Sequence, residues 1–192
     1  MVQYTDGRQT KSGRSHPNCF GIIMTDRAFA QIYCETQYRD NKETGGLLLG
    51  HFIHNMWFII ESSDPGYNCI FHPTYHINNE EYANHVCTVL SRLYKHPLSF
   101  LGMWHRHTGS NNSFSTVDNA TNTKYAKSVG NGCISLIINQ DPLFRITAYY
   151  VDICGTCISY TQTDLAIGNQ YLGRCDVLEI AAQCDIDKRK LS

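Results

Sequence analysis

Short apolar runs and helical repeats alternate along most of the chain. Apolar runs of strand length predict strands, and they cover residues 20–24, 45–50, 56–60, 100–107, 133–139 and 144–151. Apolar side chains at helical spacing predict helices after Thr25, over residues 78–95 and over residues 118–127. A turn near His54 joins the second and third strands as a hairpin. The order of these elements predicts an α/β domain in which helices flank a mixed, curved sheet.

Residues 61–76 separate the third strand from the second helix and are rich in turn-forming residues, which predicts a loop. The aromatic side chains of this loop serve either local packing or recognition of a partner. They are Tyr67, Phe71 and Tyr75. We expect the two histidines of the loop, His72 and His76, not to bind metal.

The hydrophobic pattern weakens at both ends of the chain. Residues 1–18 contain almost no apolar side chains, so we expect a polar arm there. Beyond Asp152 the pattern predicts an edge strand at residues 158–160 and a short helix at residues 171–184, followed by a charged end. We therefore divide the chain into an arm, one folded domain and an extension, over residues 1–18, 19–165 and 166–192.

The composition indicates one globular domain without a strongly charged surface. Its 192 residues include 16 Lys and Arg against 17 Asp and Glu, for a net charge of -1, so charge gives no reason to expect nucleic acid or a membrane as partner. Nine cysteines are scattered through predicted strands and helices, and the start lacks a secretory pattern, so we expect a reduced, cytoplasmic setting. We interpret Cys154 and Cys157, the single Cys-x-x-Cys, as ordinary strand and turn cysteines rather than a disulfide or metal site. The oligomeric state stays open.

The segment over residues 102–118, GMWHRHTGSNNSFSTVD, carries the candidate chemistry. His105 and His107 are two residues apart on a predicted strand, so their imidazoles point to the same side. A loop rich in Asn, Ser and Gly leads from them to Ser115 and Asp118, at the start of a predicted helix. A strand end, a loop and a helix start can converge on one point. Two imidazoles and one carboxylate suit zinc and leave its fourth position free, which is typical of catalytic sites.

Each part of this pattern has a simpler explanation when it stands alone. A single His-x-His on a strand is most often surface polarity. Ser115 and Asp118 have the spacing of a helix cap, in which the hydroxyl accepts from a first-turn amide and the helix dipole favours the acid. Because a carboxylate in a first helical turn can still face a metal, the two interpretations of Asp118 are compatible. Glu43 follows a polar turn, and by itself it would be a solvated charge.

Taken together, these residues resemble the JAMM signature of the MPN domain, which is also called the JAB domain. The signature consists of His-x-His, seven further residues and Ser-x-x-Asp, with an upstream glutamate in the segment ETGGLLLG at residues 43–50. The resemblance spans residues 20–151, most of the chain. It implies the MPN fold, which is similar to that of cytidine deaminases.

The resemblance implies a role for each polar residue of the signature. One catalytic zinc ion would be bound by His105, His107 and Asp118. Glu43 would act as general base, taking a proton from the attacking water and returning it to the leaving amine. Ser115 would donate a hydrogen bond to the oxyanion that develops during hydrolysis.

The family also implies a class of substrate. JAMM enzymes cleave isopeptide or peptide bonds after the C-terminal tail of ubiquitin-like proteins, and they bind this tail as an added strand beside the cleft. With Arg106 between the two histidines and no proline after the second, the motif is more similar to bacterial members from antiviral operons that encode ubiquitin-like proteins. We therefore expect deconjugation in antiviral defence, or trimming of a ubiquitin-like precursor. The alternative is a non-catalytic MPN scaffold, which missing ligands would indicate. We expect Arg106 to face away from the metal, although a substrate contact stays open.

Overall fold

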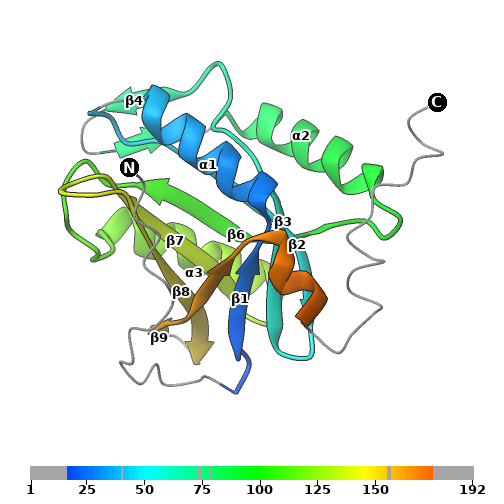
Figure 1. Cartoon of the computed structure of the whole chain (residues 1–192). Helices are drawn as coiled ribbons and strands as arrows, with labels where there is room; N and C mark the ends of the chain where they lie inside the picture. Colours follow the sequence, from blue (N-terminus) through cyan, green and yellow to red (C-terminus); the bar gives the residue numbers. More distant parts are fainter. Residues whose placement is uncertain (1–16, 40, 73–74, 78, 155–156, 175–192) are drawn as a thin grey trace.

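A computed structural model describes residues 17–39, 41–72, 75–77, 79–154 and 157–174 of the chain. One eight-stranded sheet forms its centre, with the strand order β10-β1-β3-β2-β6-β7-β8-β9 (Figure 1). The strands of this sheet are β1 (Gly21–Met24), β2 (Gly45–Ile53), β3 (Met56–Ser62), β6 (Ser99–Arg106), β7 (Cys133–Asn139), β8 (Arg145–Cys154), β9 (Cys157–Gln162) and β10 (Leu165–Ile167). The other described elements are α1 (Asp26–Tyr38), the strand pair β4 (Ile70–His72) and β5 (Tyr75–Ile77), α2 (Glu80–Leu93), α3 (Thr116–Val129) and the 3-10 helix η1 (Asn169–Arg174).

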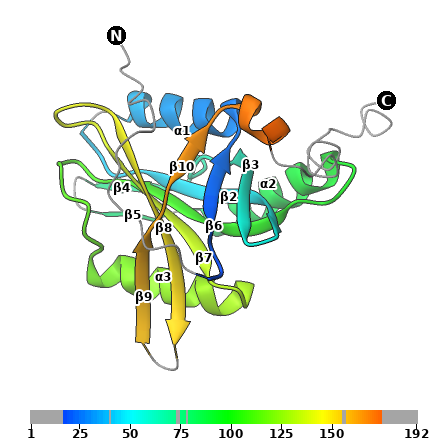
Figure 2. The same cartoon turned by 60° about the horizontal axis from the view of Figure 1, so that its bottom comes forward.

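The central sheet is mixed and curved, with helices on both faces. β1 runs parallel to β3 and β10, and β6 runs parallel to β7, whereas the other neighbouring strands are antiparallel. Figure 2 shows α1 on one side of the sheet and α3 on the other. The predicted α/β architecture is therefore confirmed.

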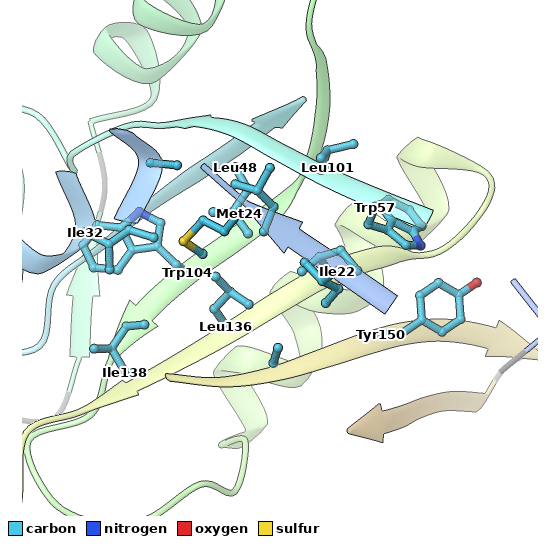
Figure 3. Packing of buried hydrophobic residues seen from close by; sticks show 14 of the residues in the cluster. Ile22, Met24, Ile32, Leu48, Trp57, Leu101, Trp104, Leu136, Ile138 and Tyr150 are labelled. Atoms are coloured by element: carbon cyan, nitrogen blue, oxygen red, sulfur yellow. The ribbon is translucent and has the colours of Figure 1, made fainter. Parts of the chain in front are cut away.

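Successive residues of the central strands point to opposite faces of the sheet and build separate layers of core. The layer beneath α1 contains Ile22, Met24, Ile32, Leu48, Trp57, Trp104, Leu136 and Tyr150 (Figure 3). On the opposite face, Ile23 and Phe58 pack with apolar residues of α2, and Cys133 and Val151 pack with apolar residues of α3. Because Trp104 belongs to the α1 layer, its neighbour His105 points to the other face, where α3 lies.

The predicted starts of the first two helices are confirmed, and a glycine in β2 allows a close approach of the backbone. Thr25 caps α1 by accepting a hydrogen bond from the amide of Ala28. Asn79 caps α2 in the same way, from the amide of Tyr82. In β2, a Cβ atom at Gly46 would lie only 2.0 Å from the carbonyl oxygen of Ser63, so no larger residue fits there without a backbone shift.

Residues 61–76, predicted as a loop, contain most of a small two-stranded sheet. β4 and β5 pair antiparallel as Ile70 with Ile77 and His72 with Tyr75. Each strand has only three residues, which is too short for a hydrophobic repeat to reveal. The loop prediction was therefore wrong for these two strands.

The helix predicted from Asp118 begins earlier, at Thr116, and ends at Val129. Asp118 therefore lies in its first turn rather than at its start.

The last strand was not predicted. β10 pairs in parallel with β1, and it crosses the boundary that the sequence places at residue 165. The start of the helix predicted over residues 171–184 lies in η1, whereas the rest of that segment and residues 1–16 of the arm lie outside the described residues. Cys154 and Cys157 end β8 and begin β9, and Cys157 is a free, exposed thiol. Among the helices that the structure describes, none is both long and apolar enough to cross a membrane.

Candidate metal centre

The side chains of His105, His107 and Asp118 converge on one point, as the sequence predicts. Their ligand atoms all lie within 4.8 Å of one another. The two Nε2 atoms of His105 and His107 are 2.8 Å apart, and they lie 3.6 and 3.8 Å from the Asp118 carboxylate oxygens. Tetrahedral zinc with bonds of about 2.0–2.2 Å separates its ligand atoms by about 3.3–3.6 Å. The donor set suits a zinc ion, and the two histidine–carboxylate separations lie close to this range, whereas the two imidazole nitrogens lie closer together than zinc ligands do.

The end of β6 fixes the first histidine inside the sheet. His105 pairs with Gly45 of β2 on one side and with Ile137 of β7 on the other. Its side chain is buried, with 1% exposed, and the ring of Phe114 packs 6.0 Å from the imidazole between ring centres. This ligand is therefore held by backbone pairing on both sides and shielded from solvent by an aromatic ring.

The second histidine is oriented through its other ring nitrogen. Nδ1 of His107 lies 2.8 Å from the carbonyl oxygen of Asn111. Because a carbonyl can only accept, Nδ1 must carry the proton, and in the neutral imidazole the lone pair of Nε2 then faces the metal position. Burial lowers the pKa of His107, but Asp118, the Asn111 carbonyl and Glu43 outweigh it and raise the pKa above its usual value.

Asp118 is held by a capping box at the start of α3. Ser115 Oγ accepts from the Asp118 amide at 3.2 Å, and the Asp118 carboxylate accepts from the Ser115 amide at 2.8 Å. Burial raises the pKa of Asp118, but the contacts with His107, His105 and Ser115 outweigh it and hold the pKa well below its usual range. The cap and the ligand position therefore coexist, because the same carboxylate serves both.

Glu43 reaches the site because the pairing of β2 with β6 continues beyond the end of the strand. Gly45 pairs with His105, and the amide of Arg106 donates to the Thr44 carbonyl at 2.7 Å. The same antiparallel register brings Glu43 beside His107. Burial raises the pKa of Glu43, the charge of His107 lowers it, and the charge of Asp118 raises it further, so that the pKa is about 7. A carboxyl that titrates near neutrality is suited to proton transfer.

Arg106, between the two histidines, faces the opposite side of the sheet as expected. Its guanidinium donates to the carbonyls of Thr36 and Arg39 at the end of α1, at 2.9 and 2.7 Å. Arg39 in turn stacks its guanidinium 3.9 Å from the ring centre of Phe71 in β4. Arg106 therefore ties the end of α1 to β6 and does not line the metal position.

The small sheet of β4 and β5 lies next to the segment that carries Glu43. The amide of Glu43 donates to the carbonyl of His72 at 3.0 Å. Of the aromatic residues expected to serve packing or recognition, Phe71 packs under Arg39, and Tyr67 is largely exposed with its ring edge against Tyr82. His72 is not among the metal-ligating groups of the described residues. The side chains of Tyr75 and His76 lie outside what the structure describes.

The side chains that hold the loop between His107 and Ser115 were not predicted from the sequence. Asn139 and Arg145 hydrogen-bond to carbonyl groups of this loop, and Phe114 shields His105. Asn139 is the polar end of the strand predicted over residues 133–139, and nothing in the local pattern points to the loop.

Comparisons with known proteins agree with this geometry. The chain matches the family described as prokaryotic homologs of the JAB domain over residues 25–149. A similar solved structure is the solution structure of protein DSY2949 from Desulfitobacterium hafniense, which is 13% identical with a TM-score of 0.53, over 76% of this chain and 92% of that chain. That likeness shows the fold alone. No curated protein matches the chain. The family match covers most of the chain, including every residue of the metal centre, and the protein belongs to the prokaryotic JAB-domain family.

Proposed function

We propose that this protein is a zinc-dependent isopeptidase or peptidase that cleaves after the C-terminal tail of a ubiquitin-like protein. The observation that carries the proposal is the cluster of His105, His107 and Asp118 together with the strand register that brings Glu43 beside His107. The JAB family includes JAMM metalloproteases as well as scaffolds. A scaffold needs no ligand set, whereas each polar position of the catalytic signature is filled here.

The residues present can perform hydrolysis of an amide. A zinc ion bound by the three ligands would activate water and polarise the carbonyl of the substrate. Glu43 takes one proton from the attacking water, and it later delivers that proton to the nitrogen of the leaving amine. The C–O bond forms first and the carbonyl oxygen takes up the electron pair of the C=O π bond; when the carbonyl re-forms, the C–N bond breaks and the protonated nitrogen leaves, which gives a carboxylic acid and a free amine.

Ser115 supplies the remaining group. Its Oγ uses a lone pair to cap α3, and its hydroxyl proton stays available. That proton can be donated to the carbonyl oxygen of the substrate as negative charge develops there. One donor of this kind contributes about 2.7–4 kcal/mol in other hydrolases.

The small sheet beside Glu43 supports an extended tail as the substrate. β4 and β5 pair with each other, and β4 contacts the Glu43 segment through the His72 carbonyl. In the described part of the chain no third strand pairs with β5, which leaves an edge for an added strand. The near-neutral charge of the chain favours recognition by backbone pairing and shape over charge. A role in antiviral defence stays a prediction from the resemblance.

Two substrates and one matched pair of variants test the proposal. A bacterial ubiquitin-like protein is joined through its tail either to a lysine side chain or linearly to a fluorescent protein, and cleavage is measured with the zinc-loaded enzyme. We expect Glu43→Gln to keep its zinc and lose turnover. Glu81→Gln, which alters an exposed glutamate of α2, should cleave at the wild-type rate. Preference between the two substrates distinguishes deconjugation from precursor trimming, whereas no cleavage of either by zinc-loaded wild type would favour the scaffold.

A further inference from the structure

We propose that Asn139 is a positioning residue for the metal ligand His107. This inference rests on the proposed zinc site. The link between the two residues is the carbonyl oxygen of Asn111, which receives hydrogen bonds from both. His107 Nδ1 lies 2.8 Å from that oxygen, and Asn139 Nδ2 donates to it at 3.2 Å.

The loop that follows His107 has the composition of a flexible segment, yet its carbonyls are bound. Asn139 donates a second hydrogen bond, to the carbonyl of Gly109 at 2.6 Å. Arg145 donates to the carbonyl of Ser110 at 2.9 Å. Tyr149 donates to the carbonyl of Asn112 at 3.1 Å. Four consecutive carbonyls, at residues 109–112, are thus held by side chains of the β7–β8 hairpin.

The register of the hairpin explains why these side chains reach the loop. Asn139 ends β7 and pairs with Arg145 at the start of β8, and Arg145 also donates to the Asn139 side-chain oxygen at 3.1 Å. The amide of His107 donates to the carbonyl of Ile138, the residue before Asn139. Asn139 therefore lies beside the point where the chain leaves β6, on the face of the sheet that bears the metal ligands.

Burial makes this arrangement rigid. The Asn139 side chain is fully buried, and both its amide nitrogen and its oxygen have partners. An amide in that position cannot rotate without leaving buried polar groups unpaired. The Asn111 carbonyl is therefore fixed in place. It holds the proton on Nδ1 of His107, and the lone pair of Nε2 stays directed at the metal position. When a group that orients a ligating histidine in this way is replaced, metal affinity typically falls about 10–100-fold.

The neighbouring residue provides a matched control. Gln140, like Asn139, donates from its side-chain amide to a backbone carbonyl, but the acceptor is Thr36 of α1, at 3.1 Å, on the opposite face of the sheet. Gln140→Ala removes an amide of the same chemical type from the next position without touching the loop. Arg145→Gln provides a milder change than Asn139→Ala in case the buried alanine variant does not fold, because Arg145 lies at the start of β8 and is only partly buried.

The test measures zinc affinity and the tautomer of His107 in the metal-free protein. Competition with a chelator should show zinc binding about 10–100-fold weaker in Asn139→Ala than in wild type, weaker by a smaller factor in Arg145→Gln, and unchanged in Gln140→Ala. Nitrogen-15 NMR at a pH above the pKa of His107, where the imidazole is neutral, should show the Nδ1-protonated tautomer in wild type and a mixture in Asn139→Ala. A purely structural role would lower stability without changing this tautomer.

Each outcome decides between the claims. Wild-type zinc affinity and an unchanged tautomer in folded Asn139→Ala would overturn the positioning role, and the same results in Arg145→Gln would do so if the alanine variant does not fold. A wild-type protein that binds no zinc would instead contradict the proposed function on which the inference rests.

Discussion

Replacing Ser115 with alanine separates the two roles that its hydroxyl can hold. Loss of the cap, a 3.2 Å hydrogen bond from the Asp118 amide, should cost about 1 kcal/mol, which lowers Tm by about 2–4 °C in a domain of 150–250 residues. Loss of a donor to the developing oxyanion should lower kcat about 10²–10³-fold. We therefore expect Ser115→Ala to combine a small loss of stability with a large loss of rate.

The second helix provides a control for this experiment. Asn79 caps α2 with a similar bond, accepted from the Tyr82 amide at 2.8 Å, and it has no place in the metal centre. Asn79→Ala should therefore lose similar stability and keep its kcat. Ser115→Thr, which retains a hydroxyl and a cap, should recover most of the rate. Tm and kcat are measured on zinc-loaded samples, and zinc content checks that Asp118 still binds. A full-rate Ser115→Ala enzyme would refute the donor role and leave only the cap.

Three further predictions concern charge and burial. The pKa of Glu43 is raised to about 7 in the folded protein, against about 4.3 in an unfolded chain. The metal-free wild type should therefore lose stability relative to Glu43→Gln as pH rises from about 4.3 to about 7. Unfolding titrations in chelator check this, and a stability difference that grows towards acid pH would contradict it. Zinc requires neutral His107, whose pKa is raised, and an ionised Asp118, whose pKa is lowered. Zinc affinity should therefore fall first as pH drops through the pKa of the histidine, as chelator competition at several pH values would show; equal affinity across that range would count against it. Arg106→Ala removes a buried cation that caps α1, and should lower stability by about 2–3 kcal/mol. Arg92→Ala, which removes an exposed arginine from the last turn of α2, should have almost no effect on Tm.

Local patterns were enough to predict the core of the metal centre. Alternation along a strand places His105 and His107 on one side, and it sends Arg106 to the other, as the structure bears out. The spacing of Ser115 and Asp118 predicts the capping box that is found. These features depend on neighbours within a few residues, so the sequence contains the information that determines them.

Features that depend on distant partners were not predicted. β10 is three residues long, and it is a strand because β1 lies beside it. Asn139 holds the Asn111 carbonyl from 28 positions away, which no spacing rule reveals. The position of Glu43 could be assigned only by the resemblance, because the register of β2 and β6 brings it to His107.

The zinc content of the purified protein tests the central claim most directly. Elemental analysis after removal of loosely bound metal should give about one zinc per chain in wild type. His85→Ala, which removes an exposed histidine of α2, should give the same value, and His107→Ala should give none. No zinc in a folded wild type, even after zinc is added, would contradict the account, and so would a His107→Ala protein that retains the wild-type content.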